Sequence, residues 1–121
     1  SIHMMDKGAL AAPGIRFFVL RDGDQALAMG AYKRINDGHA EIKSMHVLSE
    51  ARGRGLSKAM LDHLVAAARA DGFIRLSLET GVQPTFIAAR ALYDRAGFVE
   101  CPPFEGYQDD PNSIFMTKVL A

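Results

Sequence analysis

The segment "ARGRGLSKAML" (residues 51–61) decides how this sequence is interpreted, because it places two glycines and two arginines directly before a helical pattern. A glycine within a helical turn costs about 1 kcal/mol relative to alanine. That cost is compensated where something approaches the backbone closely, and the free N–H groups at a helix N-terminus attract anions. A glycine-bearing loop with solvated arginines is the alternative interpretation of the same residues.

The sequence before this segment predicts an antiparallel meander of three strands. Residues 15–20, 26–35 and 39–48 are rich in β-forming residues or alternate between apolar and polar residues. Short turn signals join them, with Gly23 in the first turn and Asp37-Gly38 in the second.

The sequence after this segment predicts two helices among further strands. Apolar residues recur at helical spacing from Leu56, and Gly72 supplies a C-terminal stop. Pro84 opens a second helix, which Gly97 closes. The remaining predicted strands are residues 73–79, 98–101 and 113–120. The order is βββαβαββ, which is an α+β domain.

Composition predicts one packed domain in a reducing compartment. The chain has 121 residues, 49% of them hydrophobic, with 14 basic and 14 acidic residues, so nothing favours a nucleic acid or membrane partner. Cys101 is the only cysteine, which suits the cytoplasm, and no apolar run approaches the roughly 20 residues of a membrane span. We interpret residues 1–4 ("SIHM") as an expression scar and residues 5–121 as the domain.

Two segments together resemble the GNAT superfamily of acyl-CoA-dependent N-acetyltransferases: "MHVLSEARGRGLSKAML" (residues 45–61) and the run from "LETG" to "ARALYDRAGF" (residues 78–98). In that family an R/Q-x-x-G-x-G/A loop holds the CoA pyrophosphate. Here the loop is Arg52-Gly53-Arg54-Gly55-Leu56-Ser57, with Ser57 where glycine or alanine is commoner. The resemblance also implies that backbone groups of Met45, His46 and Val47 bind the pantetheine arm and polarise the thioester carbonyl. It further implies that their strand is splayed from its neighbour.

The resemblance implies direct transfer of an acetyl group from acetyl-CoA, as cosubstrate, to an acceptor amine of a small molecule or protein. Tyr93 matches the tyrosine that protonates the leaving thiolate, although a helical tyrosine on its own is more often a packing residue. Glu41 and Glu79 lie on strands that can reach the cleft, and each is a candidate general base, with water as the alternative. Phe104 and Tyr107 are candidates to line the acceptor site.

The sequence does not favour a mechanism that uses a metal ion or a covalent acetyl-cysteine. His39 lies beside a turn, His63 is expected to face solvent on the first helix, and no cluster has metal-ligand spacing, so we expect no metal. Cys101 has no histidine nearby in sequence to activate it.

The residues before the meander depart from the family pattern. Family members carry a first strand and first helices there, whereas only Met5 to Gly14 remain once residues 1–4 are set aside. We therefore expect a GNAT-like fold that lacks these elements, with an uncovered side of the sheet that favours a homodimer. The same departure keeps open an alternative function, a non-catalytic acyl-CoA-binding or dimerising module.

Overall fold

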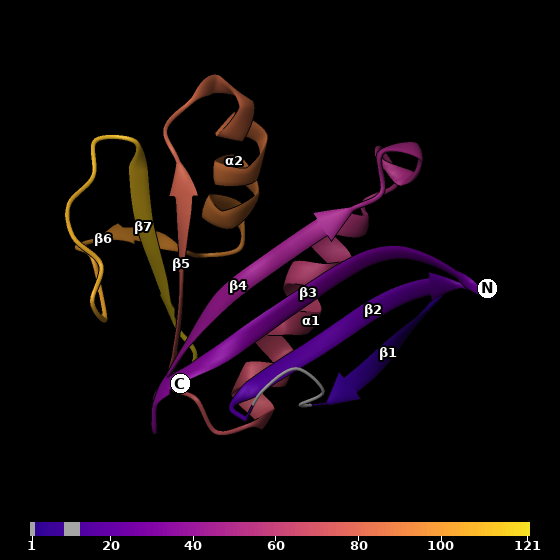
Figure 1. The fold of residues 1–121 in the computed structure, drawn as a ribbon, viewed down its shortest axis with the longest axis horizontal. Helices are drawn as coiled ribbons and strands as arrows, with labels where there is room; N and C mark the ends of the chain where they lie inside the picture. The colour runs from indigo at the N-terminus through magenta and orange to yellow at the C-terminus, as the bar shows by residue number, and fades with distance from the viewer. Residues whose placement is uncertain (1, 9–12) are drawn as a thin grey trace.

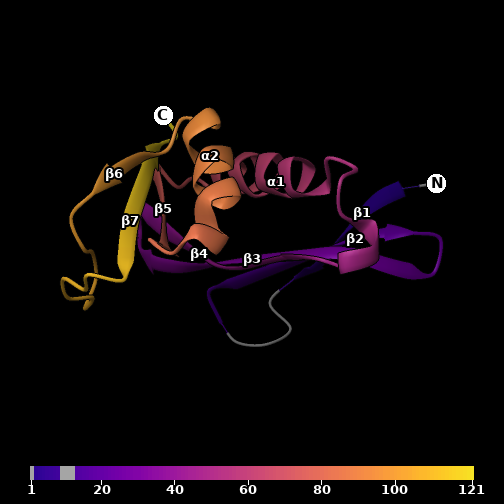
Figure 2. The same cartoon turned by 90° about the horizontal axis from the view of Figure 1, so that it is seen from above.

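The computed structural model describes residues 2–8 and 13–121. Among them seven strands form one mixed sheet in the order β1-β2-β3-β4-β5-β7-β6 (Figure 1). The strands are β1 (Ile2–Gly8), β2 (Ile15–Asp22), β3 (Gln25–Asn36), β4 (His39–Val47), β5 (Arg75–Gly81), β6 (Val99–Cys101) and β7 (Ser113–Val119). The helices are α1 (Leu56–Ala70) and α2 (Ile87–Arg95), with 3-10 turns η1 (Ser49–Ala51) and η2 (Pro84–Phe86). Figure 2 shows both α-helices on the same side of the sheet.

The predicted meander and the two predicted helices are confirmed. Strands β2, β3 and β4 pair antiparallel in sequence order. Helix α1 begins at Leu56, whereas Pro84 opens the turn η2 and α2 follows from Ile87. None of the described helices is long and apolar enough to cross a membrane.

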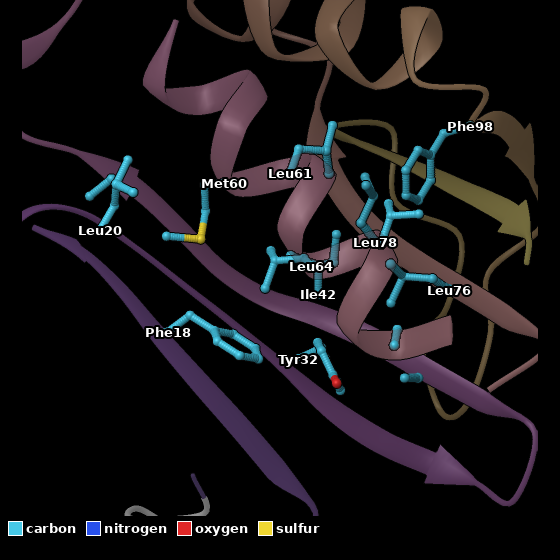
Figure 3. Packing of buried hydrophobic residues seen from close by; sticks show 14 of the residues in the cluster. Phe18, Leu20, Tyr32, Ile42, Met60, Leu61, Leu64, Leu76, Leu78 and Phe98 are labelled. Carbon is cyan, nitrogen blue, oxygen red and sulfur yellow. The ribbon is translucent and has the colours of Figure 1, made fainter. Parts of the chain in front are cut away.

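Helix α1 forms because its apolar stripe packs on the sheet. Met60, Leu61 and Leu64 are fully buried, and each such side chain contributes about 1.5–3 kcal/mol through burial. A Cβ added at Gly30 of β3 would lie 2.8 Å from the Met60 sulfur, so this glycine allows the close approach of helix and sheet. Figure 3 shows this core, with labelled side chains of α1 and the sheet directed at one another: Met60, Leu61, Leu64, Phe18, Tyr32 and Ile42.

The expectation that no strand precedes the meander is wrong. Strand β1 pairs antiparallel with β2, with Met4 opposite Leu20 and Met5 opposite Val19. Residues 2–4, which we set aside as a scar, thus take part in the sheet, and Met4 packs against the core; Ser1 lies outside the described residues. No helix precedes the meander in the part of the chain that the structure describes.

The expected splay between β4 and its neighbour is confirmed, and it positions the site. Strands β4 and β5 pair in parallel only from His39 to Glu41, whose partner is Ser77. Beyond Glu41 the two strands diverge (Figure 1). The register of β4 against β3 also shifts at this point and leaves Lys43 as a bulge, which bends a strand. The main chain of residues 45–47 therefore has no strand beside it on the β5 side.

Candidate active site

A pocket of about 330 Å³ lies between the end of β4 and the start of α1. Every residue predicted to bind CoA lines it except Arg54, and Ala51 is the one further lining residue. The lining residues are Met45, His46, Val47, Ala51, Arg52, Gly53, Gly55, Leu56 and Ser57. The structure thus brings two separate sequence segments together around one space.

The loop before α1 has the backbone geometry of an anion cradle. Gly53 and Gly55 have φ values of 81° and 74°, in the left-handed region that favours glycine, and a Cβ on either would meet nothing within 4 Å. No side chain caps α1, and no acidic residue lies in its first turn. The N–H groups at the start of α1 therefore lack intrahelical partners and face the pocket region, where an anion would be favoured.

Glu41 lies at the other end of the split, on the last residue pair that joins β4 to β5. Its side chain is buried, with 7% of the residue exposed. The Tyr107 hydroxyl donates to Glu41 Oε2 at 2.7 Å, and Lys43 Nζ lies 3.6 Å from the same oxygen. Burial and the bond to Glu41 raise the pKa of Tyr107, so its hydroxyl stays a donor at neutral pH. A buried carboxylate with these two partners is held in one position.

Glu79, the second candidate base, occupies a different environment. It is exposed on β5 and accepts a hydrogen bond of 2.6 Å from the Ser113 hydroxyl. It lines a pocket of about 320 Å³ between the end of β5 and η2, and that pocket does not include Glu41. The two candidates are therefore not brought to one site.

Tyr93 lies on α2, half-buried against the core. Its ring packs edge-on against Phe98, with 6.1 Å between ring centroids, and burial raises the pKa of Tyr93. Among the described residues its hydroxyl has no hydrogen-bond partner in the protein. It lines neither the loop pocket nor the pocket of Glu79.

The histidines differ in environment, and one expectation about them is wrong. His63 does not face solvent: its ring packs edge-on against Phe18 at 4.5 Å, and its Nε2 is buried with no hydrogen-bond partner among the described residues. His63 flanks the apolar stripe of α1, and the Phe18 ring of β2 packs against it there. The face that α1 packs on the sheet is therefore wider than its apolar pattern predicted. His39 lies 2.6 Å from the Ser77 hydroxyl. No group of residues suited to hold a metal occurs in the described ranges.

Most residues of a third pocket, of about 260 Å³ around Glu41, were not predicted from the sequence. Its lining includes Lys33, Glu41, Lys43, Glu105 and Tyr107. Only Glu41 and Tyr107 were candidates from the sequence. Lys33 stands directly opposite Glu41 in the β3–β4 register, so a correct strand alignment could have found it. The place of Glu105 depends on the loop fold, for which the sequence carries no clear signal.

Comparisons with known proteins identify the family of this chain. Residues 3–98 match the Acetyltransferase (GNAT) family. The chain is 42% identical over 120 residues to the uncharacterised N-acetyltransferase YsnE of Bacillus subtilis, covering 99% of this chain and 80% of that protein. It is 41% identical over 122 residues to an IAA acetyltransferase of Azospirillum brasilense, covering 99% of this chain and 78% of that protein.

Solved structures show the same fold. A protein of Klebsiella pneumoniae described as an acyl-CoA N-acyltransferase superposes with a TM-score of 0.88 at 27% identity, covering 99% of this chain and 98% of that one. A GNAT family acetyltransferase of Elizabethkingia anophelis, solved with acetyl-CoA bound, shares the fold with a TM-score of 0.80 at 15% identity, covering 98% of both chains. The chain belongs to the GNAT family of acetyltransferases. It is an acetyl-CoA-dependent enzyme of that family.

Proposed function

We propose that the chain binds acetyl-CoA in the loop pocket and transfers the acetyl group directly to an amine that enters on the side of Glu41. One observation carries this proposal. The predicted CoA-binding residues gather at the open end of the β4–β5 split, while Glu41 lies at the point where the split begins. The proposed acetyl-CoA site and the proposed base thus lie along the same strand, β4.

The loop residues fit the pyrophosphate of acetyl-CoA. The left-handed glycines leave open space in front of the backbone, and the first N–H groups of α1 supply donors. Arg52 and Arg54 are exposed and add positive charge near the loop. Free main-chain groups of residues 45–47 are suited to hold the pantetheine arm and to polarise a carbonyl. When bound, acetyl-CoA supplies the activated acetyl group.

In the proposed step Glu41 takes a proton from the amine nitrogen, which forms a bond to the acetyl carbon as the C–S bond breaks. Tyr93, whose role rests on its match to the family's tyrosine, gives its proton to the thiolate that leaves. Both side chains return to their starting states by exchange with solvent. Tyr107 and Lys43 keep the Glu41 carboxylate in place and compensate its charge. We assign the base role to Glu41 over Glu79 because only Glu41 is buried at the split.

The assay is release of CoA thiol from acetyl-CoA with a panel of acceptors, together with CoA-induced thermal stabilisation. We expect Glu41→Gln to lower kcat by about 10²-fold or more and to leave the stabilisation intact. The matched variant Glu79→Gln should stay within about threefold of the parent. The opposite ranking would assign the base role to Glu79. Stabilisation without any turnover in the parent would favour a non-catalytic acyl-CoA-binding module.

The acceptor is an amine of a small molecule or a protein in this proposal. One relative is named an IAA acetyltransferase, so IAA belongs in the acceptor panel beside the amines. We place the protein in the cytoplasm because the chain has a single cysteine, Cys101, and cell fractionation checks that location.

We also propose a homodimer through the sheet face opposite α1. Phe17 and Val19 alternate with the core residues of β2, so they point away from α1. With Met29 and Leu48 they line an apolar pocket of about 330 Å³. An apolar surface of this kind favours association. Light scattering at tens of micromolar checks the mass, and a monomer there would contradict the proposal.

A further inference from the structure

The pocket around Glu41 carries more charge than the base role requires. The charge of the Glu41 carboxylate is compensated by Lys43, and its Oε2 accepts a hydrogen bond from the Tyr107 hydroxyl. Arg34 also borders the pocket, but its guanidinium pairs with Asp37 at 2.9 Å and stacks over the Phe73 ring at 5.5 Å. The charge of Arg34 is therefore compensated by contacts outside the pocket.

Lys33 and Glu105 are the remaining charged side chains of the pocket, and the carboxylate of Glu105 also acts electrostatically on His39. Both side chains are exposed and line the pocket, and neither forms an ion pair with any residue that the structure describes. Lys33 stands opposite Glu41 in the strand register, so the two residues share one face of the sheet. The pocket therefore offers one ammonium and one carboxylate to a ligand, beside Glu41.

Glu105 is held in a backbone conformation that glutamate disfavours. Its φ is 42°, and the following Gly106 has φ 84°. Tyr107 N–H donates to the Phe104 carbonyl at 3.1 Å and closes the turn, and positive φ at both central positions is typical of a type I′ turn. Glycine, asparagine and aspartate dominate those positions, and other side chains are strained there.

The turn persists because the aromatic residues on both sides anchor it. The rings of Phe104 and Tyr107 pack edge-on against each other at 5.4 Å, and each contacts the Phe115 ring, at 5.6 and 5.3 Å respectively. This packing holds Glu105 at the pocket in spite of its strain. Backbone strain that the surroundings enforce is concentrated at functional sites.

We propose that this pocket takes an acceptor with both an ammonium and a carboxylate group, such as an amino acid, which rests on the transfer function proposed above. Lys33 binds the carboxylate, and Glu105 attracts the ammonium group toward Glu41. There the ammonium group loses one proton to solvent and becomes the amine that reacts. A polyamine would meet Lys33 and Lys43 as repelling charges, whereas a zwitterion presents one complementary group to Lys33 and one to Glu105.

The first test compares each of the twenty common amino acids with its amide and with the amine that lacks the carboxylate. For the best acceptor we expect kcat/KM to exceed that of its amide by about tenfold, as one charge-assisted contact provides. Lys33→Gln should reduce this ratio to within about twofold, because the variant lacks the ammonium group that binds the carboxylate. The matched control Lys58→Gln, at an exposed lysine paired with Asp62 on α1, should keep the parent ratio. A parent that uses amides or polyamines as well as amino acids overturns the proposal.

The second test separates the strain of Glu105 from its charge. Glu105→Gly removes the strain, so the melting temperature should rise by a few degrees, while KM for the amino acid should rise several-fold. Glu105→Asn tolerates the left-handed conformation and lacks the charge, so it should show the same rise in KM. A stabilised Glu105→Gly variant with an unchanged KM overturns the role of Glu105.

A third measurement does not depend on turnover. Calorimetry of the parent with N-acetyl amino acids and with the matching N-acetyl amides reads the carboxylate preference directly. If no amine is acetylated but the carboxylates bind more tightly and Lys33→Gln abolishes the difference, the transfer proposal fails and this inference stands. If amines are acetylated without any carboxylate preference in rate or binding, this inference fails and transfer stands. If no amine is acetylated and the carboxylates bind no more tightly than the amides, the transfer proposal and this inference both fail.

Discussion

At Tyr93 the aromatic ring and the hydroxyl group have separate roles, and the variant Tyr93→Phe distinguishes them. The ring contact with Phe98 remains in this variant, so the fold should be kept. Because burial raises the pKa of Tyr93, the phenol of the parent is protonated at neutral pH and available as an acid. We expect kcat to fall by more than about tenfold with CoA-induced stabilisation unchanged, since general acids contribute about 10²–10⁴-fold. Steady-state kinetics checks this, and turnover within about twofold of the parent would leave Tyr93 with a packing role alone.

Tyr107 acts on Glu41 through a single hydrogen bond of 2.7 Å. Tyr107→Phe keeps the ring packing on Phe115 and removes the hydrogen-bond donor that holds the Glu41 side chain. We expect kcat/KM at neutral pH to fall by about three- to tenfold, as the loss of one hydrogen bond provides. Steady-state kinetics is the measurement, and an unchanged kcat/KM would show that Tyr107 only packs.

At the residue scale, the sequence predicts structure formed by consecutive residues. It does not predict contacts between residues that are distant in the chain. The glycine loop before α1 could be predicted as a local structure, because its residues follow one another along the chain. Glu41 and Glu79 could not be ranked, because both stand on strands. Their difference lies in tertiary partners, namely Tyr107 for the first and Ser113 for the second.

At the scale of elements, the site depends on how β4 leaves its neighbour. The bulge at Lys43 and the end of pairing at Glu41 fall within three residues of each other, so the strand bends where the pairing stops. The alternation of residues 39–48 predicts the strand, but it carries no signal for the bulge. Strand β1 was missed for a different reason, since its first residues were attributed to a scar.

The loop between η1 and α1 can be tested as an element with matched glycine variants. Gly55 and Gly72 flank opposite ends of α1, both have positive φ, and a Cβ on either meets nothing within 4 Å. Valine at either position therefore carries a similar backbone cost, of about 1–2 kcal/mol in the free energy of unfolding. We expect only Gly55→Val to abolish CoA-induced stabilisation, as measured by thermal unfolding with and without CoA. Unchanged CoA affinity in a folded Gly55→Val protein would contradict the assignment of the pyrophosphate site.

At the scale of the whole molecule, one face of the sheet carries the core, and the other carries both an apolar pocket at Phe17 and Val19 and the charged pocket around Glu41. Helix α1 covers the core on one side, while Lys33, Glu41 and Tyr107 meet around a pocket that α1 does not line. The order of the elements could be predicted, because hydrophobic periodicity and turn residues encode it locally. The pairing of distant parts, such as β1 on β2 and the 102–112 loop on β4, depends on packing that no single segment specifies.

Stability of the whole molecule should depend on pH through His63. Burial lowers the pKa of His63 below its ordinary 6.5; the nearby Asp6 carboxylate raises it and Arg16 lowers it further. Below pH 6.5 the unfolded chain therefore binds more protons at this position than the folded chain does. The contribution of neutral His63 is fully present above pH 6.5 and is lost as the pH falls through the lowered pKa.

His63→Leu tests this directly, because leucine suits a helix and fills the space against Phe18 without a buried nitrogen that lacks a partner. At pH 8 we expect the free energy of unfolding to rise by about 1 kcal/mol, since the unsatisfied polar atom is removed. Between pH 6.5 and 5 the gain over the parent should grow. In the parent, His63 takes up a proton more readily in the unfolded chain than in the folded chain, and this difference lowers the free energy of unfolding. Urea unfolding at both pH values measures the two differences. A gain that stays constant with pH would show that other groups cause the acid destabilisation, and a loss at pH 8 would show that the imidazole nitrogen is satisfied in solution.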